Sequence, residues 1–421
     1  MNDGLSEAER ADRRRALRRI LVVLGCYFVF VQVNRSAGGV LATHLGSERG
    51  MSPTDIGTVM GAMFFASAAA QLPTGILFDR VGATRTLLLT GMVALAGIVM
   101  FALAESSWAM IAGRIAIGIG HGGVITAFYL IAMGWAPPDR VAQATGTLVG
   151  LAGGIGGALS TTPMVLALES VGIEGTFLAL AALTALLMVA ILLLVRDGPA
   201  SAAAEAGPRE SLAQSIAGMF EVVRMPELRR IFVMGICFTA PFMTIGGLWA
   251  GPYFTQVHHL GHAEASLALL ALVIALHVGT WGYGVLERLA SSRRRLVLTG
   301  VAIEVACLAV LAAWPAAPLP LAVALLFVFS CAAPLFVVLA AHARRFVPQK
   351  RAGRAITCIS LMGLTGVFLL QAGTGAAIDL IRAGGGDPAD GFRLVFATVL
   401  AALVVTAAVY ARQPEEPARA A

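Results

Sequence analysis

Long apolar stretches recur along the whole chain, and the short segments between them carry most of the charged residues. About 20 apolar residues are enough for a helix to cross the roughly 30 Å hydrocarbon core of a bilayer. The stretches lack the strict alternation of strands, and a backbone in lipid satisfies its hydrogen bonds best as a helix. The pattern predicts an all-α membrane protein with twelve transmembrane helices, at residues 18–42, 55–78, 85–104, 107–135, 141–168, 175–195, 229–257, 265–288, 296–314, 319–342, 354–381 and 392–411.

The composition supports this prediction, because 58% of the 421 residues are hydrophobic and only 13% are charged. An ordinary soluble protein carries about a quarter charged residues. The five cysteines fall within predicted spans without disulfide or metal-binding spacing, so we interpret them as small packing residues. No catalytic triad or metal framework stands out. We therefore expect no enzyme, no metal and no cofactor apart from a coupling ion.

The net charge of +6 would suggest a nucleic-acid partner for a soluble protein, but the distribution of that charge argues against one. With the N-terminus in the cytoplasm, the outside loops hold three of the 30 lysines and arginines, at Arg49, Arg382 and Arg393. Two others, Arg35 and Arg114, lie within spans. Because positive residues collect on the cytoplasmic side, this predicts a multi-pass protein of a bacterial-type inner membrane with both termini cytoplasmic. Its basic flanks would meet anionic lipid headgroups.

The chain divides into two halves at a segment rich in small residues, proline and glycine. Residues 197–227 begin with "DGPASAAAEAGPRE" and continue into a stretch whose apolar residues recur at helical spacing. This predicts a cytoplasmic linker with a short amphipathic helix on the membrane surface. Residues 1–196 are then an N-terminal bundle of six helices, and residues 228–421 a C-terminal bundle of six.

A short loop is repeated between the halves. "FDRVGATR" at 78–85 ends the second predicted span, and "LERLASSR" at 286–293 ends the eighth, 208 residues later. The acid and the two arginines of the first loop, Asp79, Arg80 and Arg85, all have counterparts in the second. A parallel repeat of this kind is typical of transporters built from two bundles.

The longer stretch "GILFDRVGATR", at 75–85, resembles the signature loop of the major facilitator superfamily. Gly75, Asp79, Arg80 and Arg85 stand at its key positions, although "GATR" carries one basic residue where the family usually has two. The resemblance implies two pseudo-symmetric six-helix bundles around a central cavity that opens alternately to each side. It also implies that these four residues latch the bundles together on the cytoplasmic side. We expect a monomer.

A closer resemblance, to the anion:cation symporters that carry organic anions with protons, rests mainly on the first half. "QVNRSAGGV" places Asn34 and Arg35 where that family has an acid and an arginine, and we add Tyr27 of the same span as a substrate-binding candidate. The fourth span, "AGRIAIGIGHGGVITAFYL", holds Arg114 and, seven residues later, His121, and "GWAPPDR" follows it. The amide at Asn34 departs from the family pattern and puts proton coupling at that position in doubt.

The chemistry of these buried groups points to an anion. Arg114 and His121 are two helical turns apart and share one helix face, and a rise of about 1.5 Å per residue places Arg35 at a depth between them. A guanidinium stays charged and binds a carboxylate with two hydrogen bonds, so Arg35 and Arg114 would attract an organic anion. His121 has the titration range for proton exchange. The alternatives are that Arg114 bonds only to backbone and that His121 is a packing residue.

In the second half, His277 and Gln371 fall near the middle of their spans and are further candidates for substrate contact. His258, His259 and His262 cluster in an outside loop, where histidines are usually solvated. We do not expect a metal there.

These observations predict a secondary transporter that moves a small organic anion by alternating access with proton symport. Its partners would be that anionic small molecule and membrane lipids, and not nucleic acid. One alternative is a proton antiporter that exports drugs or metabolites, which the scarcity of midspan acids disfavours. A second is a transporter-like sensor without turnover.

Overall fold

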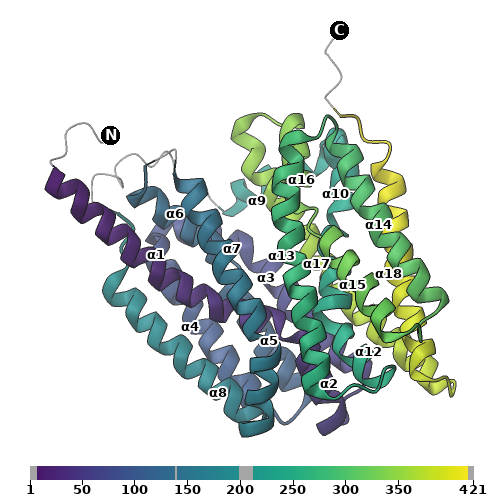
Figure 1. The fold of residues 1–421 in the computed structure, drawn as a ribbon. Helices are drawn as coiled ribbons and strands as arrows, with labels where there is room; N and C mark the ends of the chain where they lie inside the picture. Colours follow the sequence, from purple (N-terminus) through teal and green to yellow (C-terminus); the bar gives the residue numbers. More distant parts are fainter. Residues whose placement is uncertain (1–6, 138–139, 199–211, 416–421) are drawn as a thin grey trace.

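The computed structural model describes residues 7–137, 140–198 and 212–415, and these fold almost entirely into helices. The helices of the two chain halves stand side by side, the first half at the left of Figure 1 and the second at the right. In chain order they are α1 (Glu7–Ser36), α2 (Gly38–Glu48), α3 (Pro53–Val81), α4 (Ala83–Ala102), α5 (Ser107–His121), α6 (Val124–Trp135), α7 (Val141–Leu159), α8 (Thr162–Leu194), α9 (Leu212–Arg224), α10 (Pro226–Gly235), α11 (Ala240–Thr244), the π-helix η2 (Ile245–Trp249), α12 (Ala250–Gln256), α13 (His262–Leu289), α14 (Arg293–Ala313), α15 (Leu319–Ala332), α16 (Phe336–Ala343), the 3-10 helix η3 (Arg344–Phe346), α17 (Gln349–Ala383) and α18 (Pro388–Tyr410).

Eleven segments of the described chain are helical, long and apolar enough to cross a membrane, against twelve predicted spans. The difference lies at the predicted span 141–168, which an interruption at Ser160 and Thr161 divides between α7 and the first turns of α8. Within α8, Gly172 has a φ of 69°, a left-handed conformation that glycine adopts without steric penalty. Residues 162–194 are therefore two helices joined at Gly172. The all-α fold class is confirmed.

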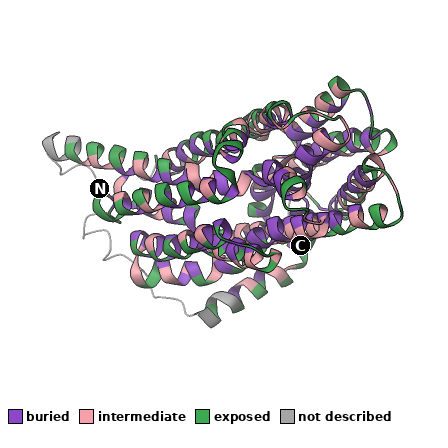
Figure 2. Cartoon of the chain, turned by 90° about the horizontal axis from the view of Figure 1, so that it is seen from below, coloured by how far each residue is buried: buried purple, intermediate pink, exposed green. Residues whose placement is uncertain are grey.

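The outward faces of the helices are apolar, as a membrane protein requires. Figure 2 shows buried positions mainly between the helices and exposed positions on the outer faces and at the ends. Leu186, Val405 and Met92, for example, are 65%, 62% and 62% exposed. Such exposure would be unfavourable in water, so these side chains face lipid. The predicted helix after the linker is present as α9, whereas most of the linker, 199–211, lies outside the described residues.

Two of the interrupted spans have their breaks near the middle of the molecule. A turn at Ala37 separates α1 from α2, and the seventh span runs through α10, α11, the π-helical η2 and α12. Transporters commonly bind substrate at discontinuous helices, and π-helical turns are frequent at functional sites. The segments 34–38 and 243–249 are therefore candidates for a binding site.

The two halves pack tightly at the end where α2 and α12 lie, at the bottom of Figure 1. α3 and α17 approach so closely that a Cβ on Gly57 would lie 2.2 Å from the carbonyl oxygen of Gln371. A Cβ on Gly38 would likewise lie 2.5 Å from the carbonyl oxygen of Gly247. Only glycine permits these contacts. In the predicted topology this is the outside, so the structure is closed on that side.

At the opposite end, an acidic residue beyond the last span of each half caps the third span of the same half. Asp197 Oδ1 accepts hydrogen bonds from the backbone N–H and the hydroxyl of Thr84, at 2.6 and 2.5 Å. Glu415 accepts from the Ser292 hydroxyl and, at 2.9 Å, from the backbone N–H of Arg294. A carboxylate satisfies the free donors of a helix N-terminus and suits its positive dipole. Thr84 and Ser292 belong to the repeated loops, so those loops have equivalent structural roles.

Replacing Glu415 by glutamine should remove a pH-dependent part of the stability. Burial raises the pKa of Glu415, but the hydrogen bonds from Ser292, Arg294 and Arg293 and the charge of nearby His342 together outweigh burial and leave the pKa below its usual value. A lowered carboxyl pKa contributes stability above the unfolded value, about 4.3, and that contribution is lost as pH falls through the folded value. We expect E415Q to lower the unfolding temperature in detergent at pH 7, and the difference from the parent to shrink towards pH 3.5. Equal differences at both pH values would contradict this, and the exposed Glu105→Gln is the control.

Candidate substrate-binding site

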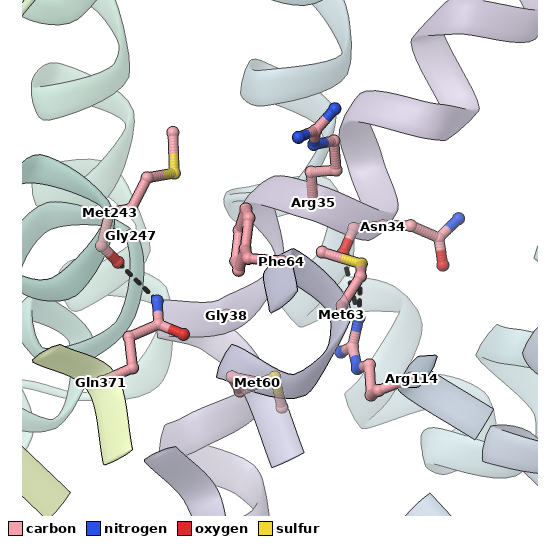
Figure 3. Close-up of a pocket in the computed structure, with 10 residues that line it drawn as sticks. All are labelled: Asn34, Arg35, Gly38, Met60, Met63, Phe64, Arg114, Met243, Gly247 and Gln371. Carbon is pink, nitrogen blue, oxygen red and sulfur yellow. Dashed lines mark hydrogen bonds between the residues drawn. The ribbon is translucent and has the colours of Figure 1, made fainter. Parts of the chain in front are cut away.

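A small pocket lies where the α1–α2 junction, α3, α5, the interrupted seventh span and α17 meet (Figure 3). The free space in it is about 10 Å³, roughly what one water molecule needs. The pocket is therefore nearly filled by its own side chains in this conformation. The lining residues are Asn34, Arg35, Gly38, Met60, Met63, Phe64, Arg114, Met243, Gly247 and Gln371, which include four of the predicted substrate-binding residues.

Arg114 is a buried cation without a carboxylate partner among the described residues. It is 1% exposed, and its Nη1 donates to the carbonyl oxygen of Asn34 at 3.0 Å. The guanidinium lies over the ring of Phe101, with Cζ 4.4 Å from the centroid, which fixes its plane. Nε and Nη2 are buried and have no hydrogen-bond partner among the residues that the structure describes. Unmade bonds of this kind cost about 1–3 kcal/mol, and more for a charged group, so these two nitrogens are available to a ligand.

Arg35 provides a second positive charge at the same pocket. Its guanidinium lies near the ring of Phe64, with Cζ 5.8 Å from the centroid. Figure 3 shows the side chains of Arg35 and Arg114 on different sides of the backbone at Asn34. No hydrogen bond or ion pair joins Arg35 to any residue that the structure describes. The pocket thus holds two cations from two different spans.

Two amide side chains add polar groups from both halves. Asn34 Nδ2 donates to the carbonyl oxygen of Phe30 at 3.0 Å, and its Oδ1 is buried without a partner among the described residues. Gln371 Nε2 donates to the carbonyl oxygen of Met243 at 2.8 Å, and its Oε1 is also unpartnered (Figure 3). A ligand in this pocket would touch both halves, as alternating access requires.

The charged side chains that line the pocket are all positive. Of the described residues that line it, two are cationic and none is anionic. A charge held away from water is unfavourable unless a partner or an aqueous cavity compensates it. The site is therefore complementary to a small anion.

The other predicted site residues lie outside this pocket. His121, at the end of α5, is 3% exposed, and its Nδ1 has no partner among the described residues. Tyr27 is 1% exposed inside the first half, with its hydroxyl equally unpartnered. His277 Nδ1 lies 2.8 Å from the carbonyl oxygen of Val273, and its ring faces Gly154 on α7. Their roles in coupling and substrate contact stay predictions.

The structure shows the residues of the predicted cytoplasmic latch in one conformation only. Asp79, Arg80 and Arg85 are exposed and make no hydrogen bond or ion pair within the described part of the chain. In the equivalent loop of the second half, Arg293 Nη2 lies 2.5 Å from Glu287 Oε1. A latch between the halves needs the cytoplasmic ends to approach, so this role stays a prediction for the state closed on that side.

Sequence reasoning did not find the apolar part of the lining, Met60, Met63, Phe64 and Met243. In a chain with 15 methionines and 20 phenylalanines, these residues have the same signature as packing residues.

Comparisons with known proteins match this chain to one family by sequence and to solved transporters by fold. The sequence pattern of the family described as Major Facilitator Superfamily matches residues 23–370. No curated protein matches the chain by sequence. Its fold is similar to that of the nucleoside transporter NupG, with 15% identity, a TM-score of 0.77 and coverage of 93% of this chain and 98% of that one.

Two further solved structures are similar. One is a bacterial homolog of the human lysosomal transporter Spinster, inward-facing and occupied, with 18% identity, a TM-score of 0.74 and coverage of 95% and 98%. The other is an auto-inhibited peptide transporter of the POT family, with 15% identity, a TM-score of 0.68 and coverage of 97% and 99%. At these identities the likeness concerns the fold.

Proposed function

The chain belongs to the Major Facilitator Superfamily, and we propose that it is a secondary transporter for a small organic anion, a carboxylate, working by alternating access. The observation that carries the proposal is the pocket whose described lining holds Arg35 and Arg114 and no carboxylate. Breaking or omitting one partner of a buried charge pair is strongly unfavourable. A bound carboxylate would supply the missing partner.

The unpartnered nitrogens of Arg114 support this class of ligand. Nε and Nη2 form one edge of the guanidinium, and this edge binds a carboxylate with two parallel hydrogen bonds. The third nitrogen, Nη1, is held by Asn34 and the plane is held by Phe101, so the edge is preorganised. Arg35 would then neutralise or orient the same anion from the first span.

The similar solved structures are named for a nucleoside transporter, a lysosomal transporter homolog and a peptide transporter. Their cargo varies on one fold, so the pocket has to decide the cargo of this chain. A pocket with two cations favours an anion over an uncharged nucleoside. The resemblance to anion:cation symporters supports the same choice.

We further propose proton symport, with His121 as the group that exchanges the proton. It lies two helical turns from Arg114 on the same helix, is buried, and has an unpartnered ring nitrogen. A proton carried with the anion would lower the charge moved across the membrane. Export by proton antiport is the alternative.

Proteoliposomes with an imposed pH gradient test both parts. We expect accumulation of at least one of radiolabelled lactate, succinate or gluconate when the outside is acidic. His121→Gln should retain exchange of labelled for unlabelled anion but lose the gradient-driven accumulation. Accumulation that ignores the gradient would rule out proton symport, and accumulation driven by an acidic interior would establish antiport. Failure of every carboxylate, with the protein folded, would rule out the cargo class.

A further inference from the structure

A second pocket lies between the halves at the closed, outer end. It is bordered by α2 and α8 from the first half and by α12 and α13 from the second. His44 on α2 and His262, the first residue of α13, both line it, and Glu169 of α8 reaches His262. The substrate site described above does not include these residues.

The two histidines are in direct contact across the interface. Their ring centroids are 4.5 Å apart with an interplanar angle of 51°. His262 Nδ1 lies 3.8 Å from Glu169 Oε1, which also joins the two halves. His44 is 1% exposed, its Nδ1 lies 3.0 Å from the carbonyl oxygen of Val40, and its Nε2 is buried without a partner among the described residues.

The hydrogen bond to Val40 fixes the tautomer of His44. A carbonyl oxygen can only accept a hydrogen bond, so Nδ1 carries the proton and Nε2 of the neutral ring is unprotonated. A second proton would go to Nε2, where no acceptor is in reach. It would also create a cation stacked on the ring of His262. The closed interface therefore accommodates neutral His44 and disfavours its charged form.

The pair can hold one proton but not two. A protonated His262 is balanced by Glu169, whereas a charged His44 has no carboxylate. The other ionisable groups at this end of the packed elements are Glu48 of α2, Asp55 of α3, Glu174 of α8, Tyr253 of α12 and Glu264 of α13, with His258 and His259 in the loop before α13; His277, Tyr283, Glu287 and Arg288 lie further along α13. None of these makes a hydrogen bond or ion pair with either histidine among the described residues, and Glu264 accepts instead from the backbone N–H of Gly261.

We propose that His44 and His262 form a proton-binding site that opens the outer gate when the outside becomes acidic. Separating α2 from α13 exposes His44 to water, where it can take up the second proton. At His44 the open state then binds a proton that the closed state does not, so falling pH favours opening through this residue, against the attraction between a protonated His262 and Glu169. An unperturbed histidine changes charge between about pH 5 and 8, so that interval is the one to test. The inference needs alternating access but not a particular cargo.

Spin-label distances across the outer gate test this without any substrate. Nitroxides at Ser47→Cys on α2 and Ala263→Cys on α13 are on exposed positions of opposite halves, in a background with the five native cysteines replaced by alanine. Between pH 8 and pH 5 we expect a second, longer distance to gain population. The ratio of open to closed should rise by up to about tenfold per pH unit for each extra proton bound.

His44→Gln keeps a side chain that can hydrogen-bond but cannot charge, and its distance distribution should not respond to pH. His262→Gln removes the stacked partner and should also weaken the response, which provides a second variant if the first folds poorly. His259→Gln, at an exposed neighbouring position, should behave as the parent. An acid response in His44→Gln equal to that of the parent, or no response in the parent, would overturn the proposal. Loss of transport for every carboxylate would leave this result unaffected.

Discussion

Arg35→Ala is expected to weaken binding of the transported carboxylate by at least about 30-fold, because removing one partner of a buried charge pair costs about 2–5 kcal/mol. Arg35 lines the pocket and has no partner within the described chain, so its loss leaves no internal bond to repair. The protein should still fold, and by the same reasoning the empty protein should become slightly more stable. Calorimetric titration of the purified protein with the best anion of the transport panel measures the change.

Two further variants show whether the loss of affinity in Arg35→Ala comes from its charge at the pocket. Arg35→Lys keeps the charge but loses the planar fork, and we expect an intermediate affinity. Arg393→Ala removes an exposed arginine paired with Asp390 in an outer loop and should bind as the parent. Unchanged affinity in Arg35→Ala would eliminate this residue as the anchor and leave Arg114 to hold the anion alone.

Gly57→Val is expected to abolish most transport by preventing closure of the outer side. A Cβ at this position would lie 2.2 Å from the carbonyl oxygen of Gln371, and backbone atoms cannot move aside as a side chain does. Overpacking costs about 1–3 kcal/mol, so the closed population should fall by about 5- to 150-fold. Uptake rates in proteoliposomes report the loss, while carboxylate binding to the purified protein should persist.

Gly373→Val is the matched control, because it lies two residues from Gln371 on the same helix and a Cβ there meets nothing within 4 Å. It should transport as the parent. Normal transport by Gly57→Val would mean that the α3–α17 contact is not part of the transport cycle.

The sequence predicted the fold class and the convergence of Asn34, Arg35, Arg114 and Gln371 for one reason. Polar groups inside apolar spans are rare and costly, so each one that is present stands out and has to face a common interior. The helix count differed at one span, because a short interruption at Ser160 and a left-handed Gly172 change the backbone without changing the hydropathy.

Contacts that depend on side-chain direction could not be predicted. His44 and His262 are far apart in the sequence, and loop histidines gave no sign that the two rings stack across the interface. His121 shares a helix with Arg114 but does not line the same pocket, because the lining depends on neighbouring spans as well as helix periodicity. The methionines and Phe64 could not be separated from the core by type alone.

The capping carboxylates Asp197 and Glu415 tie the tail of each half back to its own third helix. The end of each half is thereby fastened to its third span, and each half is expected to tilt as a unit without shearing internally. Motion between conformations would then be concentrated where few bonds cross from one unit to the other. A carrier built this way can change the side on which it releases its cargo while the packing inside each unit stays the same.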